Sequence, residues 1–129
     1  MTLKLAIVED NFIIQMFLEE ILSLMGHKVL WTADKGEDAL SCIEKRKPDL
    51  ILLDIGLSGN YNGIELAGII NEKYQIPFVF LTGNSDKPTI ENAKATGPIH
   101  IIYKPIDEDK LQEEFKLILA KFNNTQEFV

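Results

Sequence analysis

The chain has 129 residues, 46% hydrophobic and 26% charged, which suits one compact domain and leaves little room for a second. Its formal net charge of −7 argues against nucleic-acid binding by this domain, because phosphate backbones attract clustered Lys and Arg. The single cysteine, Cys42, cannot form an internal disulfide, and no apolar run approaches the roughly 20 residues that a membrane span needs. We therefore expect a cytoplasmic protein that makes no membrane contact.

Five apolar runs of strand length recur along the chain. They occupy residues 3–8, 29–32, 50–53, 78–81 and 99–103. Most of them are apolar throughout, whereas a strand with one face in water would alternate apolar and polar residues. The runs therefore predict strands that are buried on both faces of a sheet.

Helical patterns lie between these runs. In the first, apolar residues at steps of four, three and four form one helix face, at Ile14, Leu18, Ile21 and Met25. Gly26 is suited to end this helix. In the second pattern, Asp34 and Glu37 have the spacing of a capping box, and Pro48 marks the exit.

The third and fourth helical patterns span residues 63–74 and 85–96, and the fourth is more polar. Asp107 is placed to cap a last helix, whose core stripe is Leu111, Phe115, Ile118 and Phe122. We expect one domain over residues 1–122, with residues 123–129 as a frayed tail or the start of a linker. The alternation of strand and helix predicts an α/β fold, a doubly wound parallel sheet with helices on both faces and right-handed crossovers.

Polar side chains stand at the ends of four of the five expected strands. Glu9 and Asp10 follow the first, Asp54 the third, Thr82 the fourth and Lys104 the fifth. Any one of them could simply begin a loop. Parallel strands, however, bring their carboxyl ends to one edge of the sheet, where ligands bind in such folds. The set therefore predicts a shared site of three carboxylates, one hydroxyl and one ammonium.

Three carboxylates held close together repel one another and raise each other's pKa unless a cation compensates. A hard divalent ion that takes oxygen ligands, Mg²⁺ or Mn²⁺, suits this role. A carboxylate such as Asp54 can also attack phosphorus and form an acyl phosphate. Lys104 and Thr82 would then hold the phosphoryl oxygens, because phosphoryl transfer depends mainly on positioning and charge stabilisation.

Four short motifs surround these residues: IVED at 7–10, LLDIGL at 52–57, FLTG at 80–83 and YKP at 103–105. In this order and spacing they resemble the receiver domain of two-component response regulators, a CheY-like domain. The resemblance covers about residues 3–122 and implies a flavodoxin-like (βα)5 fold with strand order 2-1-3-4-5, for which this family is a standard example. It also implies a signalling switch that is not an ordinary enzyme, since it catalyses only its own aspartyl phosphorylation and dephosphorylation.

The resemblance also implies a role for each residue of the site. Asp54 would accept a phosphoryl group from a histidine kinase or a histidine phosphotransfer protein. The Mg²⁺ ligands would be Asp54, Asp10 directly, Glu9 through water, and the backbone carbonyl of Gly56.

The remaining site residues would bind the phosphoryl group and report its presence. By the resemblance, Lys104 pairs with the phosphoryl group, Thr82 bonds to it and moves inward, and the peptide bond before Pro105 is cis. The family usually carries Tyr or Phe three residues before the lysine, but Ile101 stands there in this chain. We therefore expect the switch to work through ordering of residues 83–96.

Residues beside the site are expected to tune the lifetime of the phosphoryl group. Gly56 leaves space for an attacking water, and Asn84 would orient or screen one. The loop at residues 58–63 is longer and more polar than the Pro-containing loop usual in the family. It would either contact the site or a kinase, or form a flexible surface insertion.

The first helix carries apolar residues outside its core stripe, including Phe12, Ile13 and Met16. A helix that is apolar nearly all round is either deeply buried or docks a partner. In the family that the chain resembles, the first helix is the usual dock for the phosphodonor, so we expect partner docking there. A homodimer face is one alternative, and the other is that Phe17 and Leu24 simply widen the core face.

Other functions remain as alternatives. A haloacid-dehalogenase-like hydrolase also uses an aspartyl nucleophile and Mg²⁺, but carries a carboxylate two residues later, where this chain has Gly56. The complete set of site residues disfavours a pseudo-receiver that only binds partners. The phrases GIELA, IPFVFLT and AKATGP look similar to receivers attached to LytTR-type DNA-binding domains or to hybrid sensor kinases. The chain is therefore either a free single-domain receiver or the N-terminal receiver fragment of such a protein.

Overall fold

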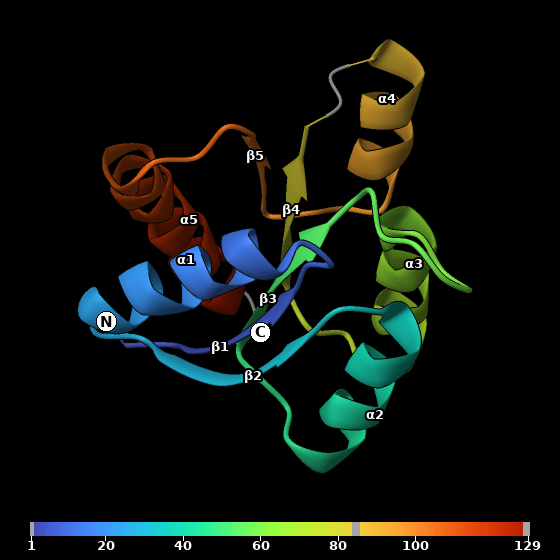
Figure 1. The fold of residues 1–129 in the computed structure, drawn as a ribbon, viewed down its shortest axis with the longest axis horizontal. Coiled ribbons are helices and arrows are strands. Elements are labelled where there is room, and N and C mark those ends of the chain that lie inside the picture. The colour runs from blue at the N-terminus through green and yellow to red at the C-terminus, as the bar shows by residue number, and fades with distance from the viewer. Residues whose placement is uncertain (1, 84–85, 128–129) are drawn as a thin grey trace.

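The computed structural model describes residues 2–83 and 86–127, and in this part of the chain five strands alternate with five helices (Figure 1). The strands are parallel and ordered β2-β1-β3-β4-β5, which confirms the predicted fold and strand order. No helix of the described residues combines the length and the apolar character that crossing a bilayer requires. The elements are β1 (Lys4–Val8), α1 (Phe12–Leu24), β2 (Lys28–Ala33), α2 (Gly36–Lys45), β3 (Leu50–Asp54), α3 (Gly63–Lys73), β4 (Phe78–Thr82), α4 (Lys87–Ala95), β5 (His100–Tyr103) and α5 (Glu108–Glu127).

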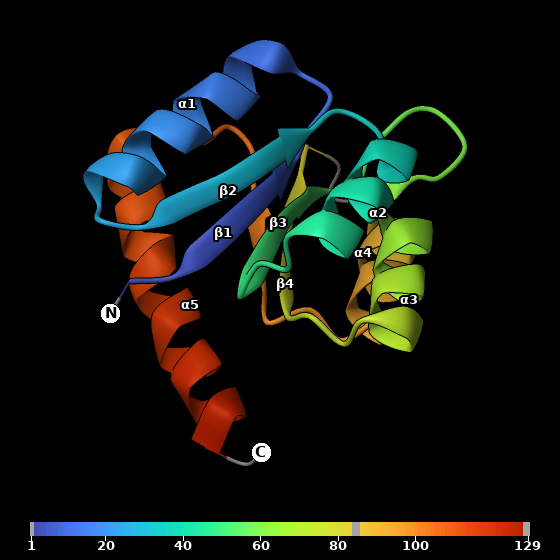
Figure 2. The same cartoon turned by 90° about the horizontal axis from the view of Figure 1, so that it is seen from below.

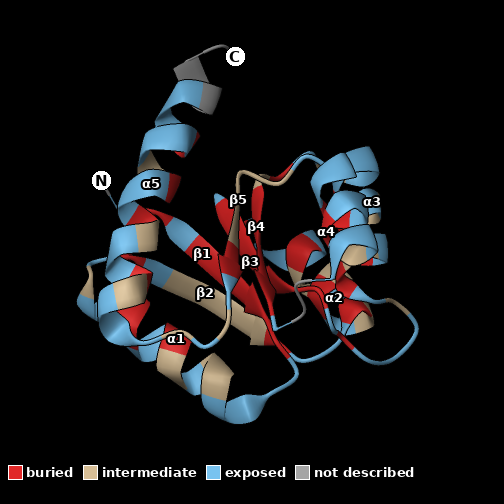
Figure 3. Ribbon diagram, turned by 90° about the horizontal axis from the view of Figure 1, so that it is seen from above, coloured by how far each residue is buried: buried red, intermediate tan, exposed pale blue. Residues whose placement is uncertain are grey.

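Helices cover both faces of the sheet, α1 and α5 on one face and α2, α3 and α4 on the other (Figure 2). β1 shows why the strand runs are apolar throughout. Leu5 and Ile7 pack on the α1–α5 side, Ala6 and Val8 pack on the opposite side, and all four are fully buried. Burial is concentrated in the central strands β1, β3 and β4 (Figure 3).

The predicted capping box at Asp34 is wrong. A box needs its polar residue directly before the first helical residue, but Lys35 is the N-cap of α2 and its side chain makes no capping hydrogen bond. The box is found instead at α3. There the Asn62 side chain accepts the Glu65 N–H at 2.8 Å, and the Glu65 carboxylate accepts the Asn62 N–H at 2.9 Å.

Residues 123–127 are expected from the sequence to belong to a frayed tail or linker, but in the structure they continue α5 to Glu127. Asn123 and Asn124 are exposed, and the final turns extend beyond the sheet (Figure 2). A helix in this position has no sheet to pack against, so its sequence needs no apolar stripe. The stripe predicted where α5 contacts the core and said nothing about where the helix ends.

Candidate functional site

Three carboxylates meet at the carboxyl end of the sheet. β1 and β3 are neighbours, with Val8 opposite Leu53, so Glu9 and Asp10 lie beside Asp54. Each of these three side chains offers a carboxylate oxygen, and the three atoms lie within 4.8 Å of one another. Glu9 and Asp54 are buried, while Asp10 is exposed. The cluster therefore fits a hard cation that takes oxygen ligands and keeps some water.

Lys104 supplies positive charge to this cluster. Its Nζ lies 3.0 Å from Glu9 Oε2 and 3.4 Å from Asp54 Oδ1, and its backbone N–H donates to the Thr82 carbonyl at 2.8 Å. Burial acts to lower the pKa of Lys104, but the hydrogen bond to Glu9 and the charges of Asp54 and Glu9 raise it overall. Burial raises the pKa of Glu9, against the opposing hydrogen bond from Lys104. The Lys104–Pro105 peptide bond is cis.

Hydrogen-bond donors fix two of the carboxylate residues. The Gly56 N–H donates to Asp54 Oδ1 at 3.1 Å, and the Asn11 N–H donates to Glu9 Oε1 at 3.1 Å. From α1, the side-chain amide of Gln15 donates to the Glu9 carbonyl at 3.1 Å. The two backbone N–H groups orient the carboxylates just after β1 and β3, and Gln15 holds the backbone of Glu9 from α1.

The chain between β3 and α3 returns very close to the backbone of Asp54. The Gly63 N–H donates to the Ile55 carbonyl at 2.9 Å. A Cβ added to Gly63 would lie 2.1 Å from the Asp54 carbonyl oxygen, so a glycine is required at this position. The requirement for glycine at position 63 is not predicted by the sequence. The Asn-Gly pair at 62–63 signals a turn, but not an approach to a distant backbone.

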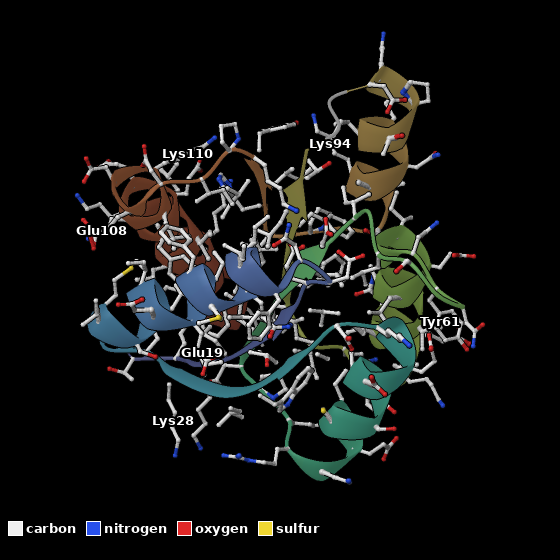
Figure 4. The ribbon with its side chains drawn as sticks, viewed as in Figure 1. Glu19, Lys28, Tyr61, Lys94, Glu108 and Lys110 are labelled. Carbon is white, nitrogen blue, oxygen red and sulfur yellow. The ribbon has the colours of Figure 1, made fainter. Side chains whose placement is uncertain are left out.

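The same loop also reaches the site and α2. Ser58 Oγ donates to Asp10 Oδ2 at 3.3 Å. Tyr61, labelled in Figure 4, packs against the start of α2, where a Cβ on Gly36 would lie 3.1 Å from Tyr61 Cβ. Of the two alternatives for this loop, the structure supports contact with the site.

The predicted switch residues lie on β4 and β5. Thr82 ends β4 and is buried. Ile101, on β5, is half-buried and packs against the side of the core that α2, α3 and α4 cover. Asn84, predicted to tune the phosphoryl lifetime, and Ser85, the predicted start of the fourth helix, lie outside the described residues. The helix begins at Lys87, after its N-cap Asp86.

α1 exposes apolar side chains near the site. Phe12 is 68%, Ile13 77% and Met16 53% exposed. Leu24 is 73% exposed and so does not widen the core, whereas Phe17 packs against it. A pocket of about 310 Å³ adjoins this surface and is lined by Ile13, Ile14, Phe17, Lys104, Pro105 and Ile106. The apolar surface of α1 is therefore continuous with the residue that carries the ammonium of the site.

The response regulator receiver domain family matches residues 5–116 of the chain, and the chain belongs to this family. It is 29% identical to the sporulation initiation phosphotransferase F of Bacillus subtilis over 124 residues, which cover 94% of this chain and 97% of that protein. It is 30% identical to the transcriptional regulatory protein PdtaR of Mycobacterium tuberculosis over 119 residues, which cover 92% of this chain. The chain spans only 58% of the length of that regulator.

Solved structures show the same fold. The signal receiver domain of a modulated diguanylate cyclase from Desulfovibrio desulfuricans superposes with a TM-score of 0.85 at 30% identity, covering 97% of this chain and 99% of that one. The chain is thus a response regulator receiver domain of two-component systems. Receiver domains generally bind Mg²⁺ at an acidic pocket and interact with histidine kinases or phosphotransfer proteins. They are signalling proteins and not classical enzymes.

Proposed function

We propose that this receiver accepts a phosphoryl group on Asp54 and transmits the signal by changing its partner binding. One observation carries the proposal. Asp54 is a buried carboxylate that faces the Lys104 ammonium at 3.4 Å and shares an acidic cluster with Glu9 and Asp10. A carboxylate that only began a loop would not need a cation held against it, whereas a nucleophile that acquires a phosphoryl group does.

In the proposed step, Asp54 attacks the phosphorus of a phosphohistidine or of acetyl phosphate. An O–P bond forms, the bond from phosphorus to the donor atom breaks, and the donor leaves with that electron pair. The Gly56 N–H holds Oδ1, which leaves Oδ2 to attack. Lys104 would then contact a phosphoryl oxygen, where its charge stabilises the developing negative charge, and the Thr82 hydroxyl would bond to another.

Glu9, Asp10 and Asp54 would hold Mg²⁺ or Mn²⁺, with the Gly56 carbonyl as a further ligand. A divalent ion would supply further positive charge, because among the described residues three carboxylates face a single ammonium. The exposure of Asp10 leaves this edge accessible from solvent.

Two neighbours are proposed to tune the lifetime of the acyl phosphate, Gly56 and Asn84. Among the described residues, a Cβ on Gly56 would meet the Asp54 carboxylate oxygens alone, at 3.8 and 3.9 Å, which supports access of water to the phosphorylated carboxylate. Ile101 carries no hydroxyl that could follow Thr82 inward. We therefore propose that switching proceeds through the β4–α4 segment, residues 83–96.

The exposed apolar surface of Phe12, Ile13 and Met16 is proposed to dock the histidine kinase or phosphotransfer protein. This surface adjoins the pocket that Lys104 lines, so a helix docked there would bring its phosphohistidine to the edge where Asp54 lies. A homodimer that uses the same surface is the alternative. The proposed setting is the cytoplasm, without nucleic-acid binding by this domain.

The length of the functional protein has two readings. The phosphotransferase of Bacillus subtilis is covered over 97% of its length, which supports a single-domain receiver over residues 1–122 with α5 continuing beyond it. The transcriptional regulator PdtaR is covered over only 58%, which supports a receiver within a longer protein, whether a LytTR-type transcription factor or a hybrid sensor kinase. A haloacid-dehalogenase-like hydrolase is disfavoured, because Gly56 stands where that class needs a second carboxylate.

The test is phosphorylation with acetyl phosphate and Mg²⁺, followed by intact mass. Wild type should gain one phosphoryl group, Asp54→Asn should gain none, and Gly56→Arg should lose the group more slowly after the donor is removed. Ile13→Asp/Met16→Asp should be labelled normally by acetyl phosphate but poorly by a phosphohistidine protein. Equal labelling of Asp54→Asn and wild type would overturn the phosphoacceptor assignment, and unchanged transfer from the protein donor would overturn the docking assignment.

A further inference from the structure

A second lysine, Lys110, donates hydrogen bonds to the backbone on both sides of Lys104. Lys110, in the first turn of α5, donates its Nζ to the carbonyls of Tyr103 and Pro105, the latter at 3.3 Å. Its backbone N–H donates to Asp107 Oδ1 at 2.7 Å, which ties the same residue to the helix start. Figure 4 shows Lys110 beside the chain that links β5 to α5.

The position of Lys110 is not explained by the stability of α5. A cation in the first turn opposes the positive end of the helix dipole, which favours acidic residues such as Glu108 and Asp109 there. Lys110 forms no ion pair among the described residues, although those two carboxylates directly precede it. The ammonium is directed instead at two backbone carbonyls, and hydrogen bonds from a charged donor are the stronger kind.

These two carbonyls flank a single residue, Lys104. From the other direction, the Lys104 N–H donates to the Thr82 carbonyl at 2.8 Å, and its Nζ contacts Glu9 and Asp54. The backbone of Lys104 is thus anchored to β4 on one side and to α5, through Lys110, on the other. A flexible four-carbon side chain can hold its ammonium at a fixed point only when the backbone beneath it is fixed.

We propose that Lys110 is a positioning residue for Lys104: by holding the carbonyls of Tyr103 and Pro105, it keeps the Lys104 ammonium aimed at Asp54. This inference rests on the proposed phosphoacceptor function for its kinetic consequence, but its structural part does not depend on that function. Lys110 touches neither Asp54 nor the phosphoryl group, so its effect must pass through Lys104. The effect of a Lys110 substitution should therefore disappear when Lys104 is also replaced.

The first measurement is the rate at which acetyl phosphate labels the full chain in Mg²⁺. Lys110→Met keeps the length of the side chain but removes its donors, and should slow labelling about tenfold. Lys110→Arg keeps charge and donors and should restore most of the rate. Lys116→Met, on the exposed face of the same helix, is the matched control and should label as wild type does.

The second measurement asks whether the effect passes through Lys104. In a Lys104→Met background, Lys110→Met should slow labelling no further, since the ammonium that it positions is gone. An equal slowing in both backgrounds would show that Lys110 acts elsewhere and would overturn the proposal. So would a normal labelling rate for Lys110→Met in otherwise wild-type protein.

The third measurement needs no phosphorylation. Amide hydrogen exchange at Lys104, whose N–H donates to Thr82, should be about tenfold faster in Lys110→Met and unchanged in Lys116→Met. Unchanged exchange in Lys110→Met would overturn the inference even if Asp54 is phosphorylated. Faster exchange in a protein whose wild type takes up no phosphoryl group would support the positioning role while the phosphoacceptor proposal failed.

Discussion

The two helices that flank the site, α3 and α4, are held to the sheet very differently. α3 buries Gly63, Leu66, Ala67 and Ile70 and starts with a reciprocal capping box, whereas α4 buries only Ile90 and Ala93. The capping bonds of α3 are 2.8 and 2.9 Å long, while the Asp86 side chain accepts the Thr89 N–H of α4 at 3.4 Å. α3, which follows Asp54, is therefore held more firmly to the sheet than α4.

This difference matches the roles proposed for the two sides. Asp54 ends β3 and precedes α3, so the proposed nucleophile lies next to the firmly held helix. Thr82 ends β4 and precedes α4, so the residue proposed to respond to the phosphoryl group lies next to the less firmly held helix. A switch needs this asymmetry, because a ligand moves an equilibrium only where two arrangements are close in free energy.

A substitution at Gly63 tests the close approach of the α3 entry to Asp54. Gly63→Ala would place a methyl group 2.1 Å from the Asp54 carbonyl oxygen, and neither backbone can yield without moving the loop or the strand end. We expect unfolding in urea to show a loss of about 3 kcal/mol or more. Labelling of the folded fraction by acetyl phosphate should also fall, because the displaced backbone carries Asp54, the proposed nucleophile.

Gly68→Ala is the matched control in the same helix. A Cβ on Gly68 meets no atom within 4 Å, so the substitution should stabilise the protein by up to about 1 kcal/mol through helix propensity. A Gly63→Ala variant as stable as Gly68→Ala would mean that the loop adjusts freely and that α3 does not form a firm frame.

A smaller effect compares the packing of the two helices. Leu66, on α3, is fully buried, and Ile90, on α4, is 9% exposed. Leu66→Ala should cost about 3–4 kcal/mol and Ile90→Ala about 2 kcal/mol or less, because a looser site collapses around the lost methyl groups. The measurement is the free energy of unfolding in urea for both variants. Equal losses in the free energy of unfolding would mean that α3 and α4 are packed equally firmly against the sheet.

The sequence predicted the parts of this site that depend on local order. Parallel strands bring their carboxyl ends together whatever the conformation of the loops. The residues that stand at these ends are Glu9, Asp10, Asp54, Thr82 and Lys104. Gly63 and Lys110 could not be predicted in the same way. The need for glycine comes from the backbone of Asp54, which is distant along the chain but close in space. Lys110 reaches carbonyls whose direction depends on how α5 meets β5.

The helix boundaries show the same limit. Asp34 and Asn62 both have an acidic residue three positions later, yet only Asn62 forms a capping box. Whether a capping box forms depends on the residue at which the chain enters the helix. For α3, this entry is set by the return of the chain past Asp54. Residue spacing alone does not carry that information.

Amide exchange with a mimic of the phosphoryl group tests whether α4 alone responds to the site. Beryllofluoride with Mg²⁺, a mimic of the phosphoryl group, should slow amide exchange in α4, Lys87–Ala95, by about three- to fivefold, which corresponds to about 1 kcal/mol of local stability. Exchange in α3, Gly63–Lys73, should stay constant, because its capping box and buried face are already formed without a ligand. The Asp54→Asn variant, which lacks the proposed acceptor, is the control and should show no change in either helix.

Equal slowing in both helices would mean that the whole site tightens together, and no change in α4 would place the switch elsewhere. An effect confined to α4 would instead show that the loosely packed helix is the element that Asp54 controls.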